Sequence, residues 1–122
     1  MRVAASEDLA KYLSEGESGF LVGLLHDPIP VIRKNAMKAA SRIRASTLLP
    51  DLREVLMEPN VTGDVRMTAA AAIGDIGGPE AERILRDALD AEDPTIRVVA
   101  AIAILRPAPA GAAREQPGAR RE

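Results

Sequence analysis

An internal repeat constrains the fold of this chain more than any other feature of its sequence. Three segments align with one another, and each has a short apolar stretch, a break that contains proline, and a longer alanine-rich stretch. The alanine-rich stretches open on the same pair of residue types, as Ile32-Arg33, Val65-Arg66 and Ile96-Arg97. The three arginines lie 33 and 31 residues apart, which is a period typical of solenoids.

Within each unit the apolar residues recur at helical spacing. The alanine-rich stretches carry them at i, i+4, i+7 and i+8, as in Ile32, Ala36, Ala39 and Ala40, in Val65, Ala69, Ala72 and Ile73, and in Ile96, Ala100, Ala103 and Ile104. One stripe at this spacing is the buried face of an α-helix. Only 2% of the residues are aromatic, and a core of small aliphatic side chains suits closely packed helices. The sequence predicts an all-α fold, an α-α superhelix of about three helical hairpins.

Proline and glycine mark the boundaries between the expected helices. Gly77-Gly78-Pro79 ends one helix and begins another, and Pro28, Pro50 and Pro94 fall near other helix starts. We therefore predict a repeat domain over residues 1–106, with a short leading helix at about 7–14 and hairpins at about 18–45, 47–77 and 79–106. Residues 107–122 are rich in Pro, Ala, Gly and Arg without apolar period, and we expect a disordered tail.

The segment from Val65 to Leu105, VRMTAAAAIGDIGGPEAERILRDALDAEDPTIRVVAAIAIL, closely resembles bacterial HEAT-like repeats of the phycobilisome-lyase type. Those repeats combine an apolar-Arg pair, an alanine-rich helix, a glycine turn with an acidic residue, and a Pro-Glu-Ala helix start. The resemblance extends over most of residues 21–106 and implies the HEAT-like fold. It leaves function open, because such repeats occur in lyases, scaffolds, regulators and adaptors alike.

Residues that would support catalysis do not converge in the sequence. There is no cysteine, and His26 is the single histidine, whereas metal hydroxylases with a HEAT-like fold depend on several His-Glu pairs. The glycines at 74, 77 and 78 lack the preceding strand of a phosphate-binding loop. We therefore predict no catalytic, cofactor-binding or metal-binding residues and no enzymatic activity.

A basic stripe is the first candidate partner surface. Between Pro28 and Pro50 there are five cations and no acid, and Lys34, Lys38 and Arg42 follow one another at i, i+4 and i+8. This stripe can meet an acidic protein surface or a nucleic-acid backbone, or be an ordinary solvated face. Arg33 belongs to the repeated arginine column, for which a structural ladder between repeats is the leading interpretation and partner binding the other.

The last predicted helix is the second candidate surface. It carries Val98, Val99, Ile102 and Leu105 outside its repeated stripe, so it is apolar nearly all round. A helix of this kind is normally buried on every side, and the terminal units of solenoids usually carry a polar cap. We expect a second copy, another protein or further repeats to cover this helix, with Val99 and Ile102 near the centre of the contact.

These features favour a non-catalytic protein-protein interaction module, such as a small scaffold, adaptor or regulator with a protein partner of unknown identity. An accessory subunit or chaperone of a lyase-like, cofactor-handling enzyme is the second hypothesis. A helical-repeat nucleic-acid binder is the third, and the net charge of −2 with few aromatic residues argues against it. No apolar run approaches a membrane span, and the chain begins without a signal-peptide pattern, so we expect a bacterial cytoplasmic protein.

Overall fold

The computed structural model describes residues 19–106, and within that range it consists of helices, with no strand. The helices form three consecutive pairs and one short 3-10 helix, η2 (Ser46–Leu48). The pairs are α2 (Gly19–Leu25) with α3 (Pro30–Arg42), α4 (Leu49–Met57) with α5 (Gly63–Ile76), and α6 (Pro79–Ala88) with α7 (Pro94–Leu105). The predicted leading helix at 7–14 and the predicted tail at 107–122 lie outside the described residues.

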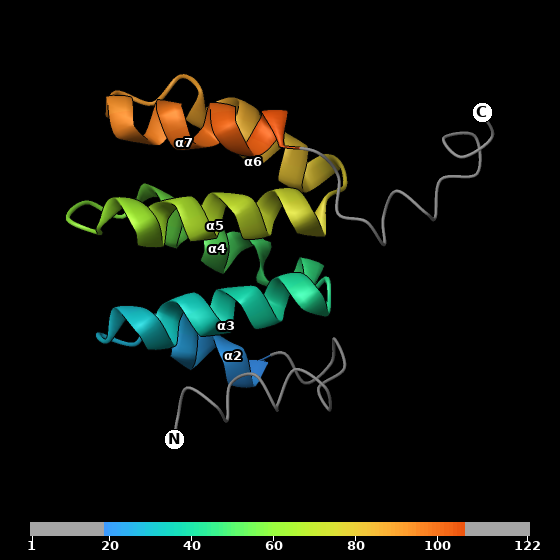
Figure 1. Ribbon diagram of the computed structural model, residues 1–122. Coiled ribbons are helices and arrows are strands. Elements are labelled where there is room, and N and C mark those ends of the chain that lie inside the picture. The colour runs from blue at the N-terminus through green and yellow to red at the C-terminus, as the bar shows by residue number, and fades with distance from the viewer. Residues whose placement is uncertain (1–18, 107–122) are drawn as a thin grey trace.

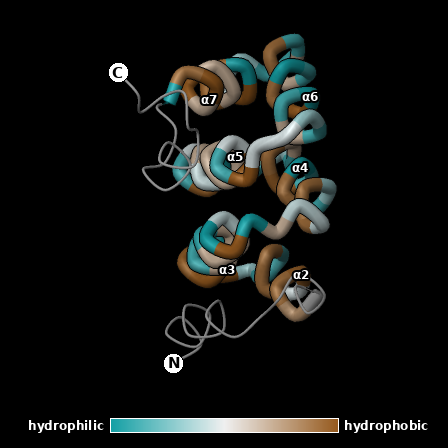
Figure 2. Tube along the Cα trace, turned by 90° about the vertical axis from the view of Figure 1, so that its right-hand side faces the viewer, coloured by the Kyte–Doolittle hydropathy of each residue, from teal (hydrophilic) through white to brown (hydrophobic). Residues whose placement is uncertain are grey.

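The three pairs stack in order, so that the first and third pairs lie on opposite sides of the second (Figure 1). Seen end-on, α3, α5 and α7 form one layer and α2, α4 and α6 form the other (Figure 2). Helix α5 packs against both α3 and α7, as well as against α4 and α6. This arrangement confirms the predicted all-α fold, an α-α superhelix built from helical hairpins.

Proline and glycine set the helix boundaries much as their chemistry requires. Four helices have a proline at their first or second position, where the missing N–H costs no hydrogen bond. At the start of α7 the Asp93 carboxylate accepts a hydrogen bond from the Thr95 backbone N–H at 2.9 Å. At the end of α5, Gly77 and Gly78 have φ angles of 73° and 95°, a conformation that favours glycine.

The hydrophobic core is one continuous cluster between the two layers and between the stacked pairs. The shorter helices contribute leucines such as Leu21, Leu25 and Leu52, while α3 and α5 contribute small residues and Ile73. The predicted buried stripe is correct in most positions, but Ile104 departs from it, because 43% of this residue is exposed. None of the helices in residues 19–106 is long and apolar enough to cross a membrane.

Candidate functional site

Each of the three repeated arginines donates to backbone carbonyls of its own hairpin, and Arg33 and Arg66 also lie beside an acid of the next hairpin. Arg33 donates from Nε to the Leu25 carbonyl at 2.9 Å and pairs with Glu58 of the second hairpin at 2.8 Å. Arg66 is buried, donates to the carbonyls of Leu56 and Glu58, and lies 3.5 Å from Asp93 of the third hairpin. These contacts support the interpretation of the column as a structural ladder, and we exclude Arg33 from the candidate partner surface.

Lys34 also contacts the following hairpin, and this contact removes it from the free basic stripe. Its Nζ lies 2.7 Å from Oδ2 of Asp64, at the start of α5. The hydrogen bond from Lys34 lowers the pKa of Asp64 to about 2, with a further contribution from the Thr62 hydroxyl. The charge of Lys34 is therefore largely neutralised by Asp64 within the molecule.

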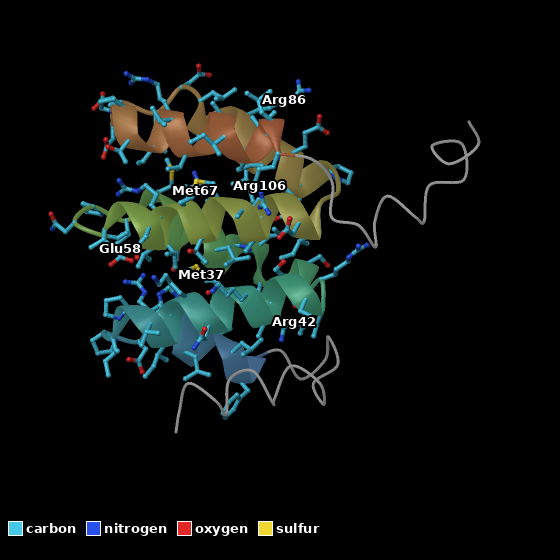
Figure 3. All side chains as sticks on the ribbon, in the orientation of Figure 1. Met37, Arg42, Glu58, Met67, Arg86 and Arg106 are labelled. Atoms are coloured by element: carbon cyan, nitrogen blue, oxygen red, sulfur yellow. The ribbon has the colours of Figure 1, made fainter. Side chains whose placement is uncertain are left out.

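The remaining two cations of the stripe, Lys38 and Arg42, lie on the edge of a groove. The groove has a volume of about 660 Å³ and crosses α3, α5 and α7. Its other lining residues are Met37, Ser41, Met67, Thr68, Ala71, Ala72, Asp75, Ile102 and Arg106. Figure 3 shows Met37 between α3 and α5 and Met67 between α5 and α7. Each methionine therefore lies at one of the two interfaces between neighbouring helices of this layer.

The edge of the groove carries an excess of positive charge. Its one acidic residue, Asp75, accepts a hydrogen bond from the Ser41 hydroxyl at 3.0 Å and pairs with Arg106 at 3.4 Å. No ion pair within residues 19–106 involves Lys38 or Arg42, and both are exposed. The groove therefore offers apolar contact on its floor and, on one side, cations that no acid within residues 19–106 neutralises, an arrangement suited to an acidic ligand with an apolar face.

The apolar residues predicted to be accessible on α7 divide into three environments. Val99 differs from that prediction, because it forms part of the hydrophobic core and is only 6% exposed. Ile102 is partly exposed and lines the groove. Val98 and Leu105 are 56% and 81% exposed, and together with Ile104 they leave the outer side of α7 apolar.

A cluster of His26, Asp51 and Glu54 links the first hairpin to the second, and sequence reasoning did not find it. The imidazole Nε2 lies 3.7 Å from one oxygen of each carboxylate, and the possible ligand atoms lie within 4.8 Å of one another. One imidazole and two carboxylates can hold a divalent transition metal. However, His26 and Glu54 are exposed, and exposed acidic groups are common in proteins without a metal ion. The available signal was the i, i+3 spacing of the two acids on α4.

Comparison with known proteins connects this arrangement to a family. The family model for HEAT repeats matches residues 17–106. The chain is also similar to the uncharacterized phycocyanin operon protein Y of Pseudanabaena tenuis, with 30% identity over 105 residues. That alignment covers 80% of this chain but 24% of the relative, so the chain spans about a quarter of the relative's length.

Proposed function

Because this chain belongs to the HEAT-repeat family, we propose that it is a non-catalytic module that binds a protein segment in the groove across α3, α5 and α7. Helical repeats of this family commonly mediate protein interactions. The single observation that carries the proposal is the combination of an apolar groove floor with two cations on its edge that form no ion pair within residues 19–106. A scaffold, an adaptor and a regulator would each need a surface that binds another protein.

The chemistry of the groove favours an acidic amphipathic helix as its ligand. Methionine side chains are unbranched and polarizable, so the partly exposed Met67 can adapt to different apolar side chains, while the buried Met37 supports the floor beneath it. Amphipathic helices bind apolar grooves through residues spaced by three and four positions. Three helices spaced by about 10 Å offer a surface about 20 Å across, long enough for about 13 helical residues. Acidic residues on one edge of that ligand would face Lys38 and Arg42.

Site-specific crosslinking tests where a partner binds. A photo-crosslinking amino acid at Ala71, inside the groove, is expected to capture the partner in the native host. The same amino acid at Arg83, which is exposed on α6 in the other layer, serves as the control. Capture from Arg83 but not from Ala71 would place the partner elsewhere.

Charge reversal then tests how the partner binds. We expect Lys38→Glu with Arg42→Glu to weaken binding of the captured protein about tenfold or more, and to reduce its salt dependence. The matched control is Arg53→Glu with Arg83→Glu, which changes the net charge equally on the opposite layer. Equal binding by the two double variants would contradict the proposed role of Lys38 and Arg42. A gel shift with duplex and single-stranded DNA tests the nucleic-acid alternative, for which we expect no binding at physiological salt.

A second candidate function is an accessory or chaperone role beside a cofactor-handling enzyme. The likeness to the phycocyanin operon protein favours it. The chain has no cysteine, so it offers no thiol to which a chromophore could be bonded. Titration with biliverdin as a probe separates the two roles, because a cofactor carrier would change the absorption spectrum of the pigment. An unchanged spectrum would leave only assistance through contact with another protein.

A further inference from the structure

Both ends of the helical stack expose apolar side chains. At the end formed by the first hairpin these are Phe20, Ile29 and Val31, which we call the leading face. At the end formed by the third hairpin they are Val98, Ile104 and Leu105 of α7, which we call the trailing face. Figure 2 shows apolar residues in the helices at both ends of the stack. Neither face overlaps the groove lining.

The trailing face occupies positions that a following hairpin covers elsewhere in the stack. Ile104 is equivalent in the repeat to Ala40 and Ile73, both of which are 0% exposed. Leu105 is equivalent to Gly74, where an added Cβ would lie 3.5 Å from the Ala103 carbonyl of the next hairpin. The outer side of α7 therefore presents the surface on which, twice in this structure, another hairpin packs.

The leading face occupies positions that contact a preceding hairpin elsewhere in the stack. Phe20 is equivalent to Asp51, which lies beside His26 of the hairpin before it. Ile29 is equivalent to Asp93, which pairs with Arg66 of the hairpin before it. In both comparisons an acid inside the stack is replaced by an apolar residue on the first hairpin.

One pair of positions connects the two faces directly. Inside the stack, Lys34 of the first hairpin pairs with Asp64 of the second. The residue equivalent to Lys34 on the trailing face is Val98, and the residue equivalent to Asp64 on the leading face is Val31. A charge pair within the molecule thus becomes a valine pair if one copy stacks on the end of another.

We propose that a second copy of this chain docks head-to-tail, with its leading face on the trailing face of the first copy. The contact continues the packing between hairpins across a molecular boundary, with apolar contacts in place of the Lys34–Asp64 ion pair. The interface is heterologous, so an assembly of any length keeps one leading face free at one end and one trailing face free at the other. The 122-residue chain is therefore expected to form open assemblies whose length grows with concentration.

Sedimentation velocity of the 122-residue chain over a range of concentrations tests this arrangement. Val31→Glu and Leu105→Glu each place a carboxylate in every head-to-tail contact, so each variant alone is expected to remain a monomer. Association should weaken about tenfold or more in either case. Both residues are exposed at helix ends, and circular dichroism checks that the variants stay folded. The matched control is Ser46→Glu, an exposed position between the first two hairpins, which should associate as the wild type does.

Mixing the two variants gives the decisive result. Val31→Glu retains an intact trailing face and Leu105→Glu retains an intact leading face, so the mixture is expected to form a one-to-one dimer. A contact between two trailing faces would instead leave Val31→Glu able to dimerise and give nothing new on mixing. That outcome, or a monomeric wild type at all concentrations, would overturn the proposal. The double variant Lys38→Glu with Arg42→Glu should leave self-association unchanged. The groove-binding proposal and the stacking proposal can therefore be contradicted separately.

Discussion

Arg66 and Arg97 occupy equivalent positions but differ in what surrounds them. Arg66 is buried against two carbonyls and lies near Asp93, whereas Arg97 is exposed and donates to the carbonyls of Ala91 and Glu92. Removing Arg66 leaves buried acceptors without a donor, so we expect Arg66→Ala to lower the free energy of unfolding by about 3 kcal/mol. Arg97→Ala should cost about 0.5 kcal/mol. Urea denaturation measures both, and equal costs would contradict the ladder interpretation.

Asp64 gives the stability of the first two hairpins a pH dependence with a defined sign. Its pKa is lowered from 3.8 to about 2 by Lys34, so folding favours the ionised carboxylate. The contribution is present above about pH 4 and is lost as the pH falls through about 2. We expect Asp64→Asn to lower the melting temperature at pH 7 and to make little difference near pH 2. A melting-temperature difference that persists unchanged at pH 2 would contradict this coupling.

At the scale of the helices, the sequence predicted the position of the second helix of each pair well. It predicted less well which side chains of that helix are exposed. The 3.6-residue period and the prolines near helix starts were sufficient to place α3, α5 and α7, because both are local signals. The exposure of Val99 and Ile104 was predicted the wrong way round. Which flank of a helix is covered depends on where the neighbouring hairpin lies, and that is a tertiary property. In α7 only one flank has a neighbour within the described residues.

Gly74 on α5 and Gly77, which follows the last residue of α5, are expected to respond in opposite ways to substitution by alanine. A Cβ on Gly74 would make ordinary contacts, 3.5 Å from the Ala103 carbonyl, so Gly74→Ala should raise the free energy of unfolding by about 0.5–1 kcal/mol through helix propensity. Gly77 has a φ of 73°, so Gly77→Ala should lower it by about 1 kcal/mol. Thermal denaturation distinguishes these results. A destabilising Gly74→Ala would mean that α5 and α7 pack too closely for any side chain there.

At the scale of the whole molecule, the groove was only half predicted. Lys38 and Arg42 were found as a stripe on one helix, because helical spacing is visible in the sequence. Met67, Asp75 and Arg106 come from other hairpins, and only the stacking brings them to the same surface. The structure also explains why Lys34 does not belong with the free cations, since its partner Asp64 lies 30 residues away in the chain.

Head-to-tail stacking also predicts how thermal stability depends on concentration. Association that occurs only in the folded state adds about 1.4 kcal/mol to stability when the protein is present at about ten times the dissociation constant. For a domain of this size that corresponds to a rise in melting temperature of about 4–8 °C. The wild-type chain should therefore melt higher as its concentration increases, while Leu105→Glu should melt at the same temperature throughout. A wild-type melting temperature that is independent of concentration, in a sample that sedimentation shows to be associated, would mean that the contact does not require the folded trailing face.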